Sequence, residues 1–171
     1  MLTTMLIPLA LAGTLPATDP DKPVAPGAHA MPGEEPVDPY VVTPANAGAR
    51  AFSGNGMARA FGGQQGIRRI VDHFVAANFA DDRVGEVFAN HDRVRIARTL
   101  FEQFCFILNA GCSYTGRDMR GAHKDMGIQR ADMNRVVENL QAAMRAEGVP
   151  FAAQNRFLAK LAPMHRDVVE R

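Results

Sequence analysis

The sequence lacks the short motifs that mark several common catalytic and cofactor sites. It contains no CxxCH, no HExxH and no GxSxG. These absences argue against covalent c-type haem, a zinc protease centre and an α/β-hydrolase nucleophile. Gly62-Gly63-Gln64-Gln65-Gly66 precedes a predicted helix, but it follows a helical segment rather than a strand. That context argues against a nucleotide-binding loop.

An excess of either charge is also missing. The chain of 171 residues has 19 Lys and Arg against 18 Asp and Glu, for a formal net charge of +1. This balance gives no electrostatic reason to expect nucleic acid or an anionic membrane as a partner. The globular part has no apolar run of the roughly 18 residues that a membrane-spanning helix needs. We therefore expect one ordinary domain with a tail and no transmembrane segment.

The N-terminus has its own character. Met1–Ala12 reads MLTTMLIPLALA, an apolar run of about the length found in signal peptides, although no Lys or Arg precedes it. Small residues follow at Gly13 and Ala17. We interpret residues 1–17 as an export signal, which would place the protein in the periplasm or tether it to a membrane by an uncleaved N-terminus. A mis-assigned start is the alternative and would leave the protein in the cytoplasm.

Residues 18–56 are rich in Pro, Gly and Ala. Eight prolines fall between Pro16 and Pro44. Because proline fixes φ and removes an amide donor, neither a helix nor an inner strand suits this stretch. We predict a disordered linker over residues 18–56.

Residues 57–171 show the periodicity of helices. Ile67, Ile70, Val71 and Phe74 recur at i, i+3, i+4 and i+7, which places them on one helical face. Capping and terminating residues predict further helices that start at Asp81, Asp92, Arg117, Asp132 and Pro150, with a kink at Pro163. No convincing strand is present, so the fold class is all-α.

Cys105 and Cys112 are seven residues apart. In a continuous helix their Cα atoms would be about 10 Å apart, which exceeds the roughly 7 Å that a disulfide spans. A bridge requires the helix to end near Asn109 and the chain to double back, which Gly111 allows. The sequence leaves both states open, a disulfide or two free thiols.

Among the five histidines, His123 has the most unusual setting. It lies in the string MRGAHKDMGI, between Gly121 and Gly127. From these residues alone, it is either a metal or haem ligand or an ordinary helix histidine. The others are interpreted as exposed side chains: His29, His73, His91 and His165.

The residues around His123 form an ordered set of motifs. YTGRDM at Tyr114–Met119 is followed by Ala122-His123 and by MGI at Met126–Ile128. Together with earlier segments, they resemble the group I truncated haemoglobins over about residues 57–169. The resemblance implies a truncated globin fold, a two-over-two α-helical sandwich around one haem b with His123 as the protein ligand of the iron. The earlier matching segments are Phe61-Gly62-Gly63, Val71–Phe74, Ala80–Arg83 and Val87-Phe88.

The resemblance also implies an apolar slot for the haem, whose propionates need cations or water at the rim. Plain core packing is the alternative role for every apolar side chain in this set. Besides His123, the expected haem-binding residues are Phe74, Val75, Phe88, Ile96, Leu100, Met119 and Ile128, and the candidate propionate partners are Arg95, Arg117, Arg120 and Lys124.

One departure from the family pattern affects the gas-binding side. Many relatives place a tyrosine where this chain has Val75, and a glutamine on the distal helix where this chain has Ile96, Thr99 and Leu100. Those polar groups donate hydrogen bonds to the bound gas, so we expect O₂ to be held weakly here. Thr99 could substitute as a donor if its hydroxyl reaches the gas, and Tyr114 could do so if its loop folds inward.

The expected function is a haem globin that reversibly binds a diatomic gas (O₂, NO or CO) at an iron that can be pentacoordinate. A reductase partner is expected but not identified. We predict no catalytic residue, with NO dioxygenation or peroxidation as side activities at most. The alternatives are a haem-free helical interaction domain and a haem protein that transfers electrons or handles NO.

Overall fold

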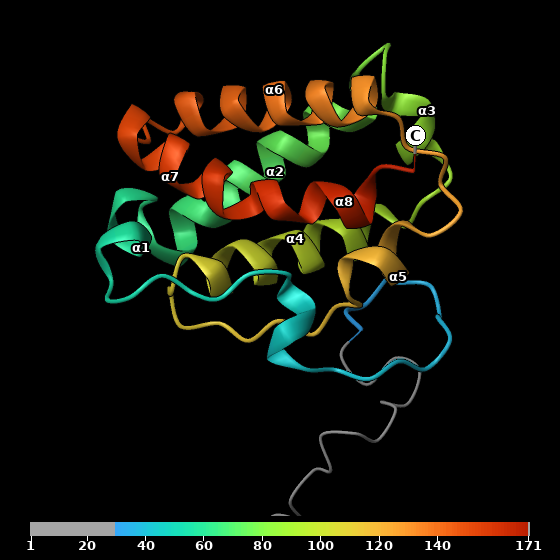
Figure 1. Cartoon of the computed structure of the whole chain (residues 1–171), viewed down its shortest axis with the longest axis horizontal. Coiled ribbons are helices and arrows are strands. Elements are labelled where there is room, and N and C mark those ends of the chain that lie inside the picture. The colour runs from blue at the N-terminus through green and yellow to red at the C-terminus, as the bar shows by residue number, and fades with distance from the viewer. Residues whose placement is uncertain (1–29, 171) are drawn as a thin grey trace, which may run out of the picture.

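A computed structural model describes residues 30–170, and within them the chain forms helices and loops without a β-strand (Figure 1). This confirms the all-α prediction and the expected two-over-two sandwich. No helix in this part of the chain is long and apolar enough to cross a membrane. The elements are η1 (Pro44–Ala47), α1 (Gly56–Ala60), α2 (Gly63–Ala80), α3 (Gly85–Ala89), α4 (Arg93–Ile107), α5 (Met119–His123), α6 (Arg130–Ala146), α7 (Phe151–Leu161), η2 (Ala162–Met164) and α8 (His165–Val168).

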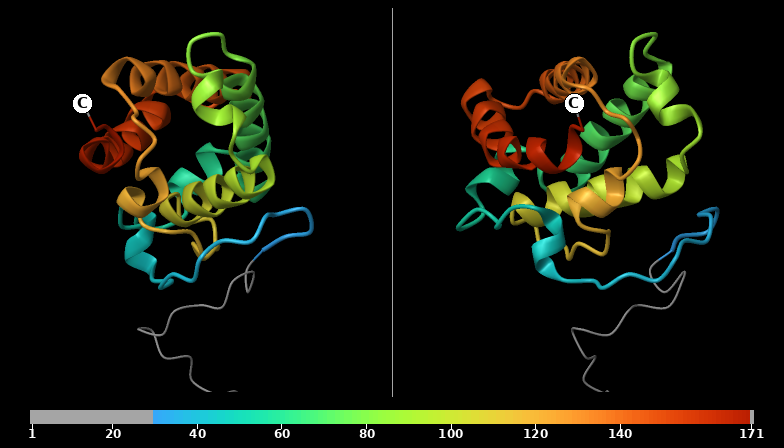
Figure 2. Two further views of the ribbon diagram at one scale, coloured as in Figure 1. Left: turned by 90° about the vertical axis from the view of Figure 1, so that its right-hand side faces the viewer. Right: turned by 45° about the vertical axis from the view of Figure 1, so that its right-hand side comes forward.

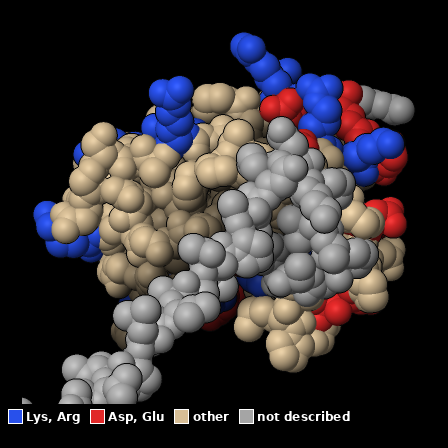
Figure 3. Space-filling model, turned by 90° about the horizontal axis from the view of Figure 1, so that it is seen from below, with Lys and Arg blue, Asp and Glu red and all other residues tan. Residues whose placement is uncertain are grey.

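Helix α2 lies at the centre of the packing, because it contacts both α4 and α6. In Figure 1, α6 runs along the top, α4 along the bottom, and the α7–η2–α8 segment crosses in front. The predicted kink at Pro163 is present, since α7 ends at Leu161 and the chain continues as the 3₁₀ turn η2. On the face seen in Figure 3, Lys and Arg lie around the edge, and uncharged residues cover most of the visible middle.

A chain of aromatic rings joins the layers of the core. The ring centroids of Phe61 and Phe157 are 5.2 Å apart, and those of Phe157 and Phe104 are 5.0 Å apart, both edge to face. Phe104 also stacks on Phe74 at 6.3 Å. Edge-to-face and offset pairs of this kind add to the stabilisation from burial alone.

The turn between α1 and α2 depends on glycine. Gly62 and Gly63 have φ values of 72° and 64°, in the left-handed region that favours glycine. At Gly66 a Cβ atom would overlap the carbonyl oxygen of Phe61, so α2 can begin this close to α1 only without a side chain there. The GGxxG string therefore serves a tight helix–helix turn, as its helical context indicated.

Residues 30–56 lie against the helical domain in fixed contacts. The hydroxyl of Tyr40 donates to the carbonyl oxygen of Thr115 at 2.8 Å, and the amide of Phe52 donates to the carbonyl oxygen of Ile107 at 2.8 Å. The predicted disordered linker over residues 18–56 therefore does not describe residues 30–56. Prolines prevented regular secondary structure there, apart from η1, but they did not prevent side-chain docking. The predicted export signal at residues 1–17 and the remainder of the predicted linker lie outside the described residues.

Cys105 and Cys112 form a disulfide, with their Cα atoms 5.5 Å apart. Helix α4 ends at Ile107, and the chain reverses through Asn109 and Gly111, which have φ values of 58° and 87°. The reversal removes the 10 Å separation that a continuous helix would impose. The bridge ties the last turn of α4 to the loop that leads to His123.

We expect the unfolded, non-reduced protein to contain no titratable thiol and the reduced protein to contain two. Closing so short a loop should stabilise the fold by about 2–3 kcal/mol, so reduction should lower the melting temperature by roughly 5–10 °C. The Cys112→Ser variant serves as the control, because its melting temperature should not respond to the reductant. Two thiols titrated without reduction would show that the bridge does not form.

Candidate functional site

Helix α5 is a single turn that carries His123 at its end. It begins after Asp118, whose carboxylate caps the helix by accepting the amide hydrogen of Gly121 at 2.8 Å. It ends before Asp125 and Gly127, both with positive φ. The predicted helix that starts at Arg117 is thus present and begins two residues later, at Met119. Its N-cap and its left-handed exit fix the direction in which the His123 backbone points.

The imidazole of His123 is oriented by its own helix. Its Nδ1 atom lies 2.7 Å from the carbonyl oxygen of Met119. Because a carbonyl oxygen can only accept, Nδ1 carries the hydrogen, and in the neutral ring Nε2 keeps a free lone pair. A backbone carbonyl that fixes the tautomer in this way is the usual second contact of a metal-binding histidine.

The surroundings of His123 favour the neutral ring. Burial lowers the pKa of His123 below its ordinary value, and nearby His91 lowers it further, whereas the hydrogen bond to Met119 acts in the opposite direction. The net lowering keeps the imidazole uncharged at neutral pH. Only the neutral ring has a lone pair to offer a metal ion.

Helix α5 is held from two sides. From α4, the amide nitrogen of Gln103 lies 3.3 Å from the sulfur of Met119. From α8, Asp167 accepts from Arg120 at 2.9 Å, an exposed ion pair of small energetic value. Past α8, the amide of Glu170 donates to the carbonyl oxygen of Ile128 at 3.0 Å. Gln103 therefore gives α5 a buried polar link to α4, whereas the packing of α5 against α8 carries the exposed pair.

The structure brings most of the predicted pocket residues into one apolar core. Six of the eight belong to it, four of them buried and two, both on α4, partly buried. Phe88 instead packs on Phe79, with ring centroids 5.6 Å apart, and His123 joins the set through Met119. The six are Phe74, Val75, Met119 and Ile128, which are buried, and Ile96 and Leu100, which are partly buried.

Neither of the two substitute donors is available to a ligand. The hydroxyl of Thr99 bonds to backbone carbonyl oxygens of its own helix, 2.9 Å from Arg95 and 3.3 Å from Ile96. The hydroxyl of Tyr114 donates to the carbonyl oxygen of Arg117 at 2.8 Å, and its ring packs over Gly116, where a Cβ atom would overlap it. Both hydroxyls therefore serve local structure.

All four candidate propionate partners have protein partners, and that of Lys124 is the most distant. Arg95 pairs with Asp92, Arg120 with Asp167, and Arg117 donates to the carbonyl oxygen of Asp38. Lys124 remains 75% exposed, with only the neighbouring carboxylate of Asp125 at 3.8 Å. Of the four, Lys124 is the side chain most free to meet an anionic group.

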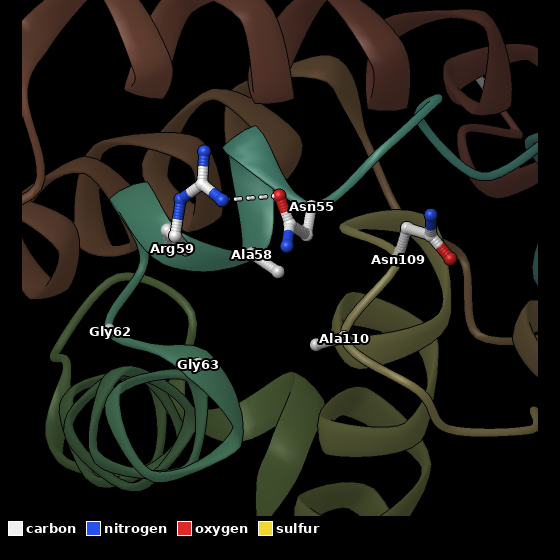
Figure 4. A pocket seen from close by; sticks show the side chains of 7 residues that line it. All are labelled: Asn55, Ala58, Arg59, Gly62, Gly63, Asn109 and Ala110. Carbon is white, nitrogen blue, oxygen red and sulfur yellow. Dashed lines mark hydrogen bonds between the residues drawn. The ribbon is translucent and has the colours of Figure 1, made fainter.

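A second surface feature lies away from these residues. It is a hollow between α1, the start of α2 and the end of α4, and Figure 4 shows the residues around it. Arg59 points along the rim and bonds to Asn55. None of the predicted site residues lines this hollow, whose lining is Asn55, Ala58, Arg59, Gly62, Gly63, Asn109 and Ala110.

A family model described as bacterial-like globin matches residues 57–170. The chain belongs to this family. A group 1 truncated haemoglobin from Tetrahymena thermophila is 32% identical over 88 residues, covering 52% of this chain and 73% of the relative. The corresponding protein from Tetrahymena pyriformis is 27% identical over 108 residues, covering 63% of this chain and 89% of the relative.

Solved structures agree with this assignment. The truncated haemoglobin of Tetrahymena pyriformis in its Fe(III) form superposes with a TM-score of 0.64 at 25% identity, covering 67% of this globin and 98% of that chain. The 2/2 haemoglobin of Synechococcus sp. PCC 7002 gives a TM-score of 0.62 at 21% identity and supports the fold alone. The resemblance to the group I truncated haemoglobins is thus confirmed, and the roles assigned to individual residues stay predictions.

Sequence reasoning missed two buried polar residues on α4. Arg98 is 5% exposed and Gln103 is 6% exposed, although both residue types usually lie on the surface. Arg98 stands between Ile96 and Leu100, where a charged residue is typical of the solvent-facing side of an amphipathic helix. Its burial depends on a partner from residues before the globin domain, which no periodicity within α4 could reveal.

Proposed function

We propose that this globin binds haem b through Nε2 of His123 and reversibly binds a diatomic gas. The observation that supports this most directly is the Nδ1 contact of His123 with Met119, which leaves Nε2 free in a setting that keeps the ring neutral. Haem iron supplies the coordination position at which O₂, NO or CO binds. The relative from Tetrahymena pyriformis, described in its Fe(III) form, supports an iron cofactor.

The side chains of this chain fit such a cofactor. The neutral imidazole is a suitable axial ligand, and the apolar residues of α2 and α4 would exclude water from the ring. Lys124 is the exposed cation nearest in sequence to His123 and would meet a propionate. The protein would therefore hold the cofactor, orient it and exclude water from it.

We further propose that the pocket holds O₂ weakly. Val75 is 3% exposed and stands where many relatives have a tyrosine donor, and the hydroxyl of Thr99 is occupied by its own helix. A donor to a partly charged ligand is worth about 1–3 kcal/mol, so its absence should speed O₂ release by roughly ten- to a hundredfold. CO and NO depend less on such a donor. NO dioxygenation, which needs stable O₂, is disfavoured for the same reason.

We also propose that the protein is exported. The disulfide between Cys105 and Cys112 supports this, because such bonds persist in oxidising compartments and are rare in the cytosol. Cell fractionation should find the protein outside the cytoplasm, and its recovery with a cytoplasmic marker would contradict the proposal.

Haem binding is tested by spectroscopy of the purified protein with added haemin. We expect a Soret band that shifts when CO is added to the reduced protein. The His123→Ala variant should lose the haem or hold it far more weakly, because it removes the imidazole that is proposed to ligate the iron. His73→Ala is the matched control, since His73 is 59% exposed and pairs with Glu147. A wild-type protein that takes up no haemin would refute the proposed function, and normal spectra in His123→Ala would remove His123 as the ligand.

The weak hold on O₂ is tested by restoring a donor at Val75. Val75→Tyr should slow O₂ release by roughly ten- to a hundredfold if its hydroxyl reaches the ligand. Val75→Phe adds the same ring without the hydroxyl and therefore controls for overpacking, which costs about 1–3 kcal/mol of stability. Stopped-flow measurements compare O₂ and CO release in both variants. Equal O₂ release from the two would show that the missing donor at this position does not set the affinity.

A further inference from the structure

Residues 30–48 form a strap that lies along the lower side of the globin domain, against α4 and the loop 111–118 (Figure 2). The family match begins only at residue 57. The part of this chain that superposes on the Tetrahymena pyriformis structure is 67% of this chain, and it already covers 98% of that structure. The strap is therefore an addition to the part of the fold that this globin shares with its relatives.

The strap is fastened by an ion pair removed from solvent. The side chain of Glu34 is 0% exposed and that of Arg98 is 6% exposed. Arg98 holds both carboxylate oxygens, with Nε on one and Nη2 on the other at 3.0 Å. Arg95 adds a more distant cation at 3.9 Å. A bidentate pair of this kind fixes position as well as charge.

Arg98 also joins the strap to the loop that leads to α5. Its Nη1 donates to Glu102 at 3.1 Å and to the hydroxyl of Thr115 at 2.7 Å. Glu102 in turn accepts the amide hydrogen of Thr115 at 2.9 Å. The carbonyl oxygen of Thr115 accepts from Tyr40 of the strap. The strap, α4 and this loop thus share one polar network.

A second fastening reaches the His123 helix. The amide nitrogen of Gln103 donates to the strap carbonyl of Ala47 at 3.0 Å and touches the sulfur of Met119 at 3.3 Å. The carbonyl oxygen of Met119 is the one that orients His123. The buried side chain of Gln103 therefore connects the strap to Met119, whose carbonyl oxygen orients the imidazole of His123.

The position of Arg98 on α4 determines which side of this helix the strap holds. Arg98 lies two residues after Ile96 and two before Leu100, so it points to the opposite side of α4 from these predicted pocket residues. A strap that clamps the outer side of α4 also limits how far Ile96 and Leu100 can move.

We propose that the strap positions α4 for gas binding, with Glu34 as a positioning residue that acts through Arg98. This inference rests on the proposed haem function. With the clamp released, the pocket would open more often, and gas would enter and leave faster. The intact strap would slow both steps.

The test compares CO binding and release in haem-loaded full-length protein after flash photolysis. Glu34→Gln should accelerate both rates by roughly three- to tenfold, the scale of coupling that packed networks carry. Glu147→Gln is the control, because it removes a carboxylate that joins α2 to the end of α6 through Arg69 and should leave both rates unchanged. Tyr40→Phe, which deletes one strap hydrogen bond, should change the rates in the same direction by less, and it replaces Glu34→Gln if that variant does not fold.

A double variant separates clamping from an unpaired charge. In Glu34→Gln the Arg98 cation loses its main partner, whereas Glu34→Gln with Arg98→Met removes both charges. If the clamp is what matters, the double variant stays fast. Recovery of wild-type rates in the double variant would overturn the proposal, since the unpaired cation would then be the cause.

Hydrogen exchange of the same proteins gives a second readout. Glu34→Gln should speed exchange of the α4 amides and leave those of α6 unchanged. Unchanged α4 exchange, or faster exchange with unaltered CO rates, would overturn the positioning role. A wild type without a CO-sensitive Soret band would instead refute the proposed function, so the two failures are distinguishable.

Discussion

The hydrogen bond from Nδ1 of His123 to the carbonyl oxygen of Met119 is the contact on which the candidate site depends. It chooses the tautomer, turns Nε2 away from the helix backbone and works together with burial, which holds the pKa of His123 low. The bond exists only while α5 is a helical turn. The cap at Asp118 and the buried amide of Gln103 preserve that turn.

Helix α4, like α5, is held in place by several contacts along its length. Asp92 caps its start by accepting the amide hydrogen of Arg95 at 3.0 Å, and the disulfide at Cys105 fixes its end. Between these points, Arg98 and Gln103 bind residues from outside the family match. The helix that carries Ile96 and Leu100 is thus held at both ends, on its outer side by Arg98 and on the side of Ile96 by Gln103, which leaves it little freedom.

Much of this arrangement follows from local sequence signals. Asp92 and Asp118 begin helices, Gly62 ends one, and Pro163 breaks another, because caps and glycine or proline geometry act within a few residues. The apolar core follows from the helical period. The ordered motifs around His123 then selected the globin fold from the many helical folds that such periodicity allows.

The sequence could not reveal contacts between distant segments. Glu34 and Arg98 are 64 residues apart, and each looks like an exposed side chain in its own surroundings. The proline content before residue 56 correctly indicated little regular secondary structure, but it says nothing about docking by side chains. The disulfide depended on where α4 ends, and the left-handed conformation at Asn109 is uncommon for a residue other than glycine.

The apolar pocket and the strap are connected through α4, which lines the one and is held by the other. On the proposed function, a pocket without a donor at Val75, Ile96 or Leu100 cannot retain a gas by hydrogen bonding. The residence of the gas then depends on the shape of the pocket and on how readily α4 moves to let the gas pass. On the strap proposal, the buried Glu34–Arg98 ion pair on the outer side of α4 restricts the movement of this helix without placing a polar group beside the gas. Because burying two charges is costly unless they are fully paired, the strap can fasten the helix only in one register, with Glu34 on Arg98. On the two proposals, fastening from outside the pocket therefore slows the exchange of gas in both directions, whereas only a donor inside the pocket would raise the affinity.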